Sequence, residues 1–353
     1  MRVNSPPEAK VEKLRVGLIG CGSMGASLAK ACAGLERAEV VAVSDIVAEA
    51  AEKLGHELGA EAYADNGDKI LGRDDIAGVI VATPNYLHCD GVVRAARAGK
   101  HVFSEKPLAT NVADCDAIIA AVEQAGVKLQ VGQVLRYLPL QAKTIELVRS
   151  GRYGEPIAIS ITRVGGGYGR AWAAHWRNSH EQSGGILMEV NAHELDLMGH
   201  ICGDAVSVCA SAHRYLRQRM QTPDQVFMIV NFKRGAMGQL HSSSASAIGE
   251  VNCRVQCREG AVLYRGSTLQ HGKFGEEPET IESSEIEVEN AVAREVREWV
   301  DAVLDDTPVT IPGSDGRKAV ELAEAAYESA RSGKPVRLPL KQATGVMSGP
   351  WED

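Results

Sequence analysis

The chain lacks the features of several large classes of protein. No stretch approaches the roughly 18 consecutive apolar residues of a membrane helix, so a membrane-embedded function is not expected. Lys and Arg form no cluster, and the formal net charge is −8. Because phosphate backbones and anionic lipid surfaces are bound by concentrated positive charge, neither nucleic acid nor a membrane surface is an expected partner.

Paired cysteines, an export signal and internal repeats are lacking as well. The eight cysteines are scattered along the chain without a CxxC pair. Residues 1–13 are polar and contain no apolar segment like that of a secretory signal, so we interpret them as a leader before the first strand. Free thiols without an export signal are typical of a cytoplasmic protein, which is the location we expect.

The 353 residues favour two domains, and the sequence changes its pattern near residue 138. Before that point, β-rich apolar runs alternate with helical patterns. This alternation predicts a Rossmann-type α/β domain over residues 14–137, with a doubly wound parallel sheet. Its strands are expected at 14–20, 39–45, 76–83, 101–105 and 128–134.

Residues 138–340 are expected to form an α+β domain. A helix is indicated at 184–203, and the strand-like runs after it are joined by short turns without helices between them. Such runs predict a large open, mostly antiparallel sheet. Helices are expected at 291–306 and again in the segment of about 316–340, which can pack back on the first domain. Residues 341–353 are expected to form a tail.

A GxGxxG sequence lies between the first expected strand and the first helix, and it reads Gly20-Cys21-Gly22-Ser23-Met24-Gly25. The first glycine permits a tight turn, the second lets the backbone approach a pyrophosphate, and the third lets helix and strand pack closely. The helix N-terminus at Ser23 and Met24 then offers N–H groups to the anion. A purely structural glycine turn is the alternative, which the position between strand and helix disfavours.

Asp45 ends the second expected strand, about 20 residues past the glycine turn. A carboxylate at this place accepts hydrogen bonds from ribose hydroxyls and repels a 2′-phosphate. The next residue is Ile46 and not an arginine. The sequence therefore predicts NAD as the cofactor in preference to NADP.

Polar residues gather where three of the expected strands end. In a doubly wound sheet, ligands lie beyond the carboxyl ends of the strands. Taken singly, each residue is compatible with ordinary loop chemistry, but their common edge indicates a cofactor site. The expected cofactor contacts beyond the glycine turn and Asp45 are Thr83, Pro84, Asn85, His88, Glu105, Lys106 and Gln133. We expect Pro107 to fix the backbone beside Lys106, with a cis Lys106–Pro107 peptide as one way of doing so.

Several stretches make the chain resemble the Gfo/Idh/MocA oxidoreductase family, whose members are sugar and polyol dehydrogenases that use nicotinamide cofactors. The resemblance spans about residues 14–340 and includes "GLIGCGSMG", "VFSEKPLA", "VGQVLRYLP", "GGILMEVNAHELDLMGHICG" and "SGKPVRLP". It implies NAD(P)-dependent oxidation of a sugar or polyol hydroxyl. It also implies a homodimer or homotetramer assembled through the open sheet of the second domain.

The resemblance further implies particular catalytic residues. In this family the lysine of the EKP motif enters the active site, and a helix of the second domain supplies an acid and a histidine four residues apart. Carried onto this chain, these are Lys106 and His193, with Glu189 where the family usually has Asp. The extra methylene of Glu189 displaces its carboxylate, so contact with His193, contact with the sugar, or both are open.

The expected helix at 184–203 allows three interpretations from its own residues. Glu189, His193, Asp196 and His200 are spaced four, three and four apart, so they would share one helix face. They could be metal ligands, a solvated helix face, or acid–base groups in which a neutral histidine accepts a hydroxyl proton. The resemblance favours catalysis, with Lys106, Glu189 and His193 as catalytic residues and no metal.

Aromatic and basic residues around the glycine-rich stretch 165–169 are candidates for substrate binding. The faces of Trp and Tyr stack on the C–H surfaces of sugars, and Arg and His bind hydroxyl groups. Ordinary loop and core positions are the alternative for each of them singly. Together with Lys106, Glu189 and His193, the expected substrate contacts are Arg136, Tyr137, Arg163, Tyr168, Trp172, His175, Trp176 and Arg177.

We therefore expect an NAD-dependent oxidoreductase that moves a hydride between the nicotinamide and a secondary hydroxyl of a sugar, polyol or glycoside. Two alternatives stand beside it. An enzyme could hold NAD tightly and carry out redox-neutral chemistry, such as glycoside cleavage or sugar-to-sugar hydride exchange. A non-catalytic NAD-binding sensor could dispense with Lys106 and His193, so their presence argues against it.

Overall fold

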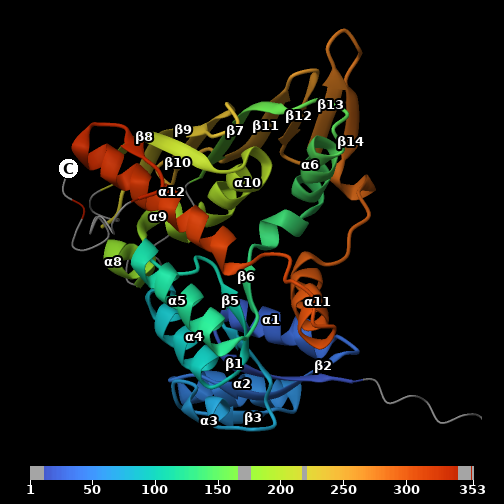
Figure 1. Ribbon diagram of the computed structural model, residues 1–353, viewed down its shortest axis with the longest axis vertical. Coiled ribbons are helices and arrows are strands. Elements are labelled where there is room, and N and C mark those ends of the chain that lie inside the picture. The colour runs from blue at the N-terminus through green and yellow to red at the C-terminus, as the bar shows by residue number, and fades with distance from the viewer. Residues whose placement is uncertain (1–11, 166–175, 217–220, 341–350, 352–353) are drawn as a thin grey trace, which may run out of the picture.

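The computed structural model describes residues 12–165, 176–216, 221–340 and 351, and these form two sheets with their helices (Figure 1). The first sheet has six strands in the order β3-β2-β1-β4-β5-β6, all paired in parallel. The strands are β1 (Leu14–Ile19), β2 (Ala38–Ser44), β3 (Glu61–Tyr63), β4 (Gly78–Val81), β5 (His101–Glu105) and β6 (Leu129–Gly132). The expected Rossmann sheet is confirmed, and the short edge strand β3 is an addition to it.

Helices cover both faces of this sheet because its strands are apolar on both sides. All four residues of β4 are buried, for example, as is usual for parallel strands. The helices of this part are α1 (Ser23–Ala33), α2 (Ala48–Leu58), α3 (Asp68–Leu71), α4 (His88–Arg97) and α5 (Val112–Ala125). Two 3₁₀ turns, η1 (Asn85–Leu87) and η2 (Val134–Tyr137), follow the carboxyl ends of β4 and β6.

The second sheet has nine strands in the order β14-β13-β12-β11-β7-β10-β9-β8-β15. Only the β10–β7 pair is parallel among the described strands, so the expected open, mostly antiparallel sheet is confirmed. The strands are β7 (Pro156–Val164), β8 (Ala205–His213), β9 (Gln225–Phe232), β10 (Met237–Ser243), β11 (Glu250–Cys257), β12 (Gly260–Arg265), β13 (Thr268–Lys273), β14 (Glu279–Glu282) and β15 (Val336–Arg337).

Helices α6 (Pro139–Arg149), α10 (Ala192–Cys202) and α12 (Gly313–Ser332) pack against one face of the second sheet (Figure 1). On the other face large apolar side chains are exposed. Phe227 is 51% exposed and Ile229 52% exposed on β9, and Met237 is 56% exposed on the paired strand β10. The remaining elements are η3 (Trp176–Asn178), α8 (His180–Ser183), α9 (Gly185–Glu189), η4 (Ser283–Glu285) and α11 (Ala291–Leu304).

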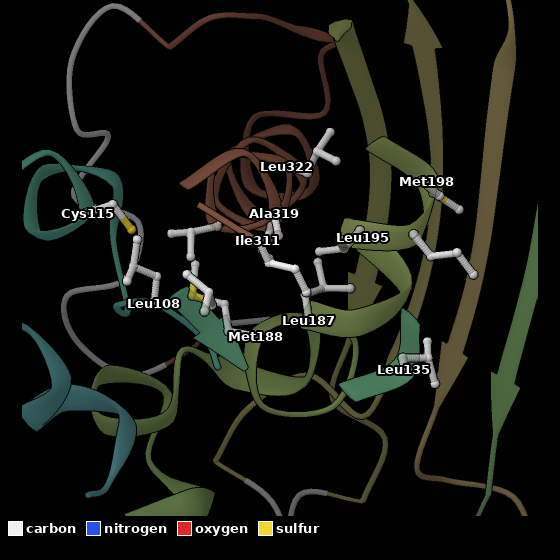
Figure 2. Packing of buried hydrophobic residues seen from close by; sticks show 14 of the residues in the cluster. Leu108, Cys115, Leu135, Leu187, Met188, Leu195, Met198, Ile311, Ala319 and Leu322 are labelled. Atoms are coloured by element: carbon white, nitrogen blue, oxygen red, sulfur yellow. The ribbon is translucent and has the colours of Figure 1, made fainter. Parts of the chain in front are cut away.

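A continuous apolar core joins the two sheets (Figure 2). Leu108 and Leu135, from the carboxyl edge of the Rossmann sheet, belong to the same cluster as Leu187 of α9 and Leu195 of α10. Helix α12 lies against α5 and β6 of the first sheet and also against α10 and β8 of the second. The two parts therefore hold each other in a fixed relation at the edge where the Rossmann strands end.

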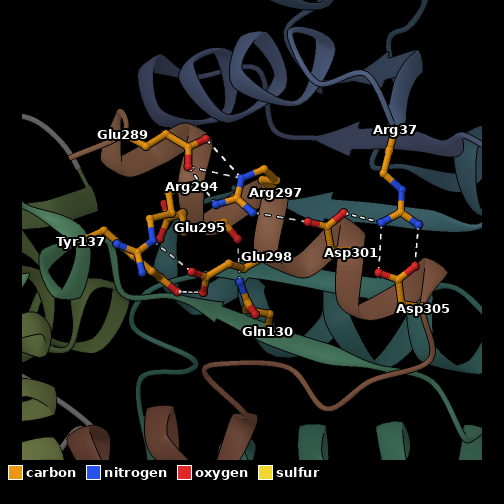
Figure 3. Close-up of polar contacts among 10 residues, drawn as sticks. All are labelled: Arg37, Gln130, Tyr137, Glu289, Arg294, Glu295, Arg297, Glu298, Asp301 and Asp305. Carbon is orange, nitrogen blue, oxygen red and sulfur yellow. Dashed lines mark hydrogen bonds and ion pairs between the residues drawn. The ribbon is translucent and has the colours of Figure 1, made fainter. Parts of the chain in front are cut away.

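Helix α11 packs against the Rossmann sheet, although its sequence position suggested the second domain. Its stripe of Val296, Trp299 and Val300 is fully buried against α1 and β1, and Trp299 meets Phe103 edge to face at 5.9 Å. The physical reason is that this face of the sheet needs an apolar cover. A surface ion pair adds to the contact, since Arg37 bonds Asp301 at 2.7 Å (Figure 3).

Helix α11 also makes two polar contacts with β6 and the η2 turn that follows it. The amide Nε2 of Gln130 donates to the carbonyl oxygen of Glu295 at 2.6 Å, and the Tyr137 hydroxyl donates to Glu298 at 2.7 Å (Figure 3). These bonds fix α11 beside the β6 end. None of the helices in the described ranges has the length and apolar character required to cross a membrane.

Candidate active site

The glycine turn is built as a phosphate site requires. Gly20 has φ +98°, and a Cβ on it would lie 2.6 Å from the carbonyl oxygen of Ala82. A Cβ on Gly25 would overlap the carbonyl oxygen of Gly20. At Gly22, by contrast, a Cβ would meet no described atom within 4 Å. The outer glycines thus serve the protein's own packing, and the middle one leaves space for a ligand.

The N-terminus of α1 faces the same turn. Gly22 is the N-cap residue, and no described side chain caps the helix. The helix therefore presents its positive end and its first N–H groups, at Ser23 and Met24, to the open space. This donor set fits the pyrophosphate of a dinucleotide.

Asp45 lies half-buried at the end of β2, beside the turn. Its Oδ2 accepts the Cys21 N–H at 2.8 Å and its Oδ1 accepts the Val47 N–H at 2.8 Å. These bonds orient the carboxylate at the mouth of the turn, and each oxygen keeps a second lone pair for a ribose hydroxyl.

Thr83 and Asn85 follow β4 at the same edge of the sheet. The Thr83 Oγ1 is buried and has no hydrogen-bond partner among the described residues, which is consistent with a polar ligand there. Asn85 instead uses its amide hydrogens inside the protein, since Nδ2 donates to the Ser183 carbonyl at 2.8 Å and to Glu189 Oε2 at 2.7 Å. Asn85 thus connects the Rossmann edge to α8 and α9.

The His88 ring lies between two backbone carbonyl groups. Its Nδ1 lies 2.7 Å from the carbonyl oxygen of Pro107, and its Nε2 lies 2.8 Å from that of Thr83. The ring is buried and a backbone carbonyl oxygen lies beside each nitrogen, so neither nitrogen is left for the cofactor contact that we expected. His88 instead ties the loop after β5 to the loop after β4.

The EKP motif occupies the carboxyl end of β5, and its Lys106–Pro107 peptide is cis, as anticipated. The Lys106 side chain crosses to the second domain, where Nζ donates to the carbonyl oxygen of Glu189 at 2.8 Å. Glu105 Oε2 accepts the Lys106 N–H at 2.9 Å. Burial raises the pKa of Glu105 to about 7, although the charge of Lys106 counteracts part of this effect.

The helix expected at 184–203 is divided into α9 and α10. The N–H groups of Val190 and Asn191 both donate to the carbonyl oxygen of Ile186, at 3.0 and 3.1 Å, so the chain makes one wide turn there. The Asn191 side chain holds this turn, because its Oδ1 accepts from the Ser242 hydroxyl at 2.5 Å. The extra residue rotates α10 relative to α9, and Glu189 and His193 no longer share a continuous helix face.

The four polar residues of that expected face consequently have four different partners. Glu189 Oε1 accepts from Arg177 Nε at 2.8 Å and Oε2 accepts from Asn85, and within the described ranges its carboxylate makes no hydrogen bond to His193. Asp196 pairs with Arg136, and His200 Nδ1 lies 3.4 Å from Arg149. Among the described residues, no three His, Cys, Asp or Glu side chains are arranged to hold a metal ion.

His193 begins α10 and faces the EKP loop. Its Nδ1 lies 2.7 Å from Gln133 Oε1, at the end of β6. Burial, the charge of Lys106 and the charge of Arg163 lower the pKa of His193 well below its ordinary value. The imidazole is therefore neutral near pH 7. Lys106 and His193, 87 positions apart, are thus brought close enough to interact electrostatically.

Glu194 is a site residue that the sequence did not reveal. It is buried, and its carboxylate pairs with Arg163 at 3.3 Å and accepts from Asn191 Nδ2 at 3.3 Å. The sequence signal that could have revealed Glu194 was an acidic residue between His193 and the apolar Leu195, on a helix that packs against the second sheet. Glu194 orients Arg163, which reaches this region from β7.

Arg136 and Tyr137 are not placed with Lys106 and His193. Arg136 is buried between Asp196, at 2.5 Å, and Asp315, at 2.8 Å, and the Tyr137 hydroxyl is bound to Glu298. Both line a separate cavity of about 660 Å³ between α6 and α11, whose lining includes neither Lys106 nor His193. The structure therefore does not place these two expected substrate contacts beside Lys106 and His193, because Arg136 is held by its ion pairs and Tyr137 by its bond to Glu298.

Of the remaining expected substrate residues, Tyr168, Trp172 and His175 lie outside the described residues. Trp176 and Arg177 form η3, and the Arg177 guanidinium lies 4.5 Å from the centre of the Trp176 ring. Arg177 also bonds Glu189, whose carbonyl oxygen accepts from Lys106, so this pair lies near the EKP loop. The charges of Arg163 and Lys106 both act on Glu194, so these residues belong to the same region.

A parallel Rossmann sheet with an open phosphate turn, joined to a domain that adds a histidine to its carboxyl edge, defines a dinucleotide-binding oxidoreductase of two domains. The chain belongs to the Gfo/Idh/MocA family of oxidoreductases. The family model for the NAD-binding Rossmann fold matches residues 14–133. The model for the C-terminal alpha/beta domain matches residues 145–338.

Similar proteins share nearly the full length of the chain. The scyllo-inositol 2-dehydrogenase (NAD(+)) of Bacillus subtilis is 27% identical over 95% of this chain and 99% of its own. The inositol 2-dehydrogenase of Rhizobium meliloti is 28% identical over 92% and 99%. The crystal structure of aldose-aldose oxidoreductase from Caulobacter crescentus, complexed with glycerol, is 27% identical over 93% and 100%, with a TM-score of 0.84.

The glycine turn yields a paired prediction. Gly22→Ala should leave the free energy of unfolding within about 0.5 kcal/mol of wild type, because the new methyl group meets no described atom. It should weaken NAD binding by about tenfold or more, since the methyl group enters the phosphate space and costs about 1.4 kcal/mol. Gly25→Ala should instead destabilise the fold by about 1–3 kcal/mol through overpacking.

Urea unfolding and NAD titration of the two variants check this prediction. Unchanged NAD affinity in Gly22→Ala would show that the open space beside Gly22 is not the phosphate site.

Proposed function

We propose that this protein is an NAD-dependent oxidoreductase that transfers a hydride between a secondary hydroxyl of a sugar or polyol and the nicotinamide, with Lys106 and His193 as its acid–base pair. The inositol dehydrogenases of Bacillus subtilis and Rhizobium meliloti, which align over nearly all of both chains, support this substrate class. The observation that carries the proposal is the bond from Lys106, at the Rossmann edge, to the Glu189 carbonyl oxygen, which brings its charge near enough to His193 of α10 to lower the pKa of that imidazole.

The residues divide the chemistry between them. When bound, a nicotinamide ring supplies the hydride acceptor for the carbinol carbon. His193 takes the hydroxyl proton on its Nε2, because its Nδ1 is directed at Gln133. Lys106 stabilises the negative charge that develops on the same oxygen. The bond from Lys106 to the Glu189 carbonyl holds the ammonium group in place for this role.

Two groups of side chains near Lys106 are proposed to contact the substrate. Arg163, set by Glu194, and the Trp176–Arg177 pair, set by Glu189, present cationic and aromatic surfaces that suit hydroxyl groups and sugar C–H faces. Glu189 acts in this arrangement by holding Arg177 and Asn85. The sequence adds Tyr168, Trp172 and His175 to the proposed set.

Redox-neutral chemistry with retained NAD is a second candidate, and a specific observation supports it. The structurally similar Caulobacter crescentus protein is named an aldose-aldose oxidoreductase, and this name is compatible with hydride exchange between two sugars. A screen of polyols and sugars with free NAD separates the two candidates. If NADH absorbance rises by one equivalent for each molecule of product, net oxidation is supported. If product forms without free NADH, the exchange is supported.

Removing either member of the acid–base pair should stop turnover. We expect Lys106→Ala and His193→Ala each to lower kcat by about 10²–10⁴-fold, the usual contribution of a positioned acid–base group. NAD affinity should stay near that of wild type, because the glycine turn is untouched. The measurements are steady-state kinetics on a substrate from the screen and fluorescence titration with NAD.

Two variants on the exposed surface of α2, Lys53→Ala and His56→Ala, remove the same side chains away from the site and serve as matched controls. Wild-type turnover in both Lys106→Ala and His193→Ala would contradict the proposed mechanism.

We further propose that Asp45 makes the enzyme prefer NAD over NADP. The carboxylate repels a 2′-phosphate, so Asp45→Asn should reduce the ratio of the NADP and NAD dissociation constants by about tenfold, or about 1.4 kcal/mol. Asp74→Asn, on the exposed surface, changes the net charge equally and should leave the ratio unchanged. Equal ratios in wild type and Asp45→Asn would refute the role of this charge.

We also propose that the protein assembles as a homodimer or homotetramer through the open face of the second sheet. Phe227, Ile229 and Met237 expose apolar surface there, which a partner would remove from water. In analytical ultracentrifugation, the Phe227→Asp/Ile229→Asp double variant should therefore sediment as a smaller species than wild type. Phe274→Asp, 75% exposed on the hairpin after β13, is the control and should assemble normally. A monomeric wild type would rule the proposal out.

A further inference from the structure

The hydrogen-bond partner of His193 is the amide of Gln133 and not a carboxylate. Gln133 is 1% exposed, and its Oε1 lies 2.7 Å from His193 Nδ1. Its backbone is held on both sides, because its N–H donates to Val131 and its carbonyl oxygen accepts from Arg136. An amide oxygen only accepts hydrogen bonds. The hydrogen of the neutral imidazole is therefore on Nδ1, and the lone pair is on Nε2.

The carboxylates around α10 are all engaged with other groups. Glu189 is held by Arg177 and Asn85, and Glu194 by Arg163 and Asn191. Asp196 is paired with the buried Arg136. Within the described part of the chain, none of these acids bonds to His193.

The charged groups that face His193 are cationic. Lys106 approaches from the end of β5 and Arg163 from β7. Burial is the largest cause of the lowered pKa of His193, and the charges of these two residues lower it further. From the end of β6 the neighbouring side chain is the neutral Gln133. A carboxylate at Nδ1 would stabilise the imidazolium and act against these effects.

We infer that Gln133 is the positioning residue for His193: a neutral amide sets its tautomer, whereas Glu189 holds the substrate-side Arg177 and takes no part in the proton transfer. The wide turn at Asn191 separates Glu189 from His193, and the end of β6 supplies the replacement partner. The base thus works without a charged neighbour on Nδ1. This inference rests on the proposed function, because it concerns the same histidine.

A carboxylate placed at position 133 tests this arrangement. In Gln133→Glu, the acid-side pKa of the kcat/KM profile should rise by about one unit or more, because an adjacent anion favours the imidazolium. Gln133→Met removes the acceptor at similar size and should lower kcat by about tenfold or more without raising that pKa. Glu189→Gln should leave the acid-side pKa in place. Gln124→Glu, exposed on α5, adds the same charge away from the site and is the matched control.

A second measurement needs no change in Gln133. In the ¹⁵N spectrum of wild-type enzyme labelled at histidine, assigned by comparison with His193→Asn, Nδ1 should carry the hydrogen and Nε2 should not. The opposite tautomer, or an acid-side pKa that falls in Glu189→Gln and stays fixed in Gln133→Glu, would overturn the inference. If His193→Ala keeps full turnover, the proposed function itself fails. If His193→Ala is inactive while the position-133 variants leave the profile unmoved, only the role of Gln133 fails.

Discussion

The apolar core between the two sheets is the constraint on which the active site depends. Lys106 is followed by buried Leu108, and Glu189 is preceded by buried Leu187 and Met188. These side chains meet in one cluster at the carboxyl edge of the Rossmann sheet (Figure 2). Because packed interiors deform little, the hydrogen bond from Lys106 to the Glu189 carbonyl has a fixed geometry. The polar arrangement around it is a consequence of apolar packing directly beneath.

Charge is distributed unevenly across that arrangement. Arg163 and Arg177 are each held by a carboxylate, and Lys106 by a carbonyl oxygen. His193 is the exception, since its partner is an amide. Glu194 and Glu189 thus orient the two arginines and do not bond the imidazole. The charges that act on the imidazole are those of Lys106 and Arg163, which are positive. Such a field favours an alkoxide over an alcohol and a neutral imidazole over a charged one.

Sequence was sufficient where function rests on local chemistry. The glycine turn, the acid after β2 and the EKP motif are each specified by a few adjacent residues, so their positions followed from strand–turn–helix order. The sequence was insufficient where residues far apart in the chain determine the position of a helix or a side chain. The apolar periodicity runs on through Asn191 without a sign of the break between α9 and α10. A residue far along the chain, Ser242 on β10, bonds the Asn191 side chain at that break. Likewise, Arg136 lies after a strand like a ligand residue, but Asp196 and Asp315 bind it elsewhere.

The return of α11 to the Rossmann sheet has a consequence for synthesis on the ribosome. The strands through β6 are made first, yet the face around Phe103 is closed only when Trp299 arrives from much farther along the chain. At translation rates of about 5–20 residues per second, that interval is roughly 10–30 s. During it the nascent domain carries an uncovered apolar face. Chaperones that bind such faces are therefore suited to this chain at an intermediate stage of its synthesis, before its second half is complete.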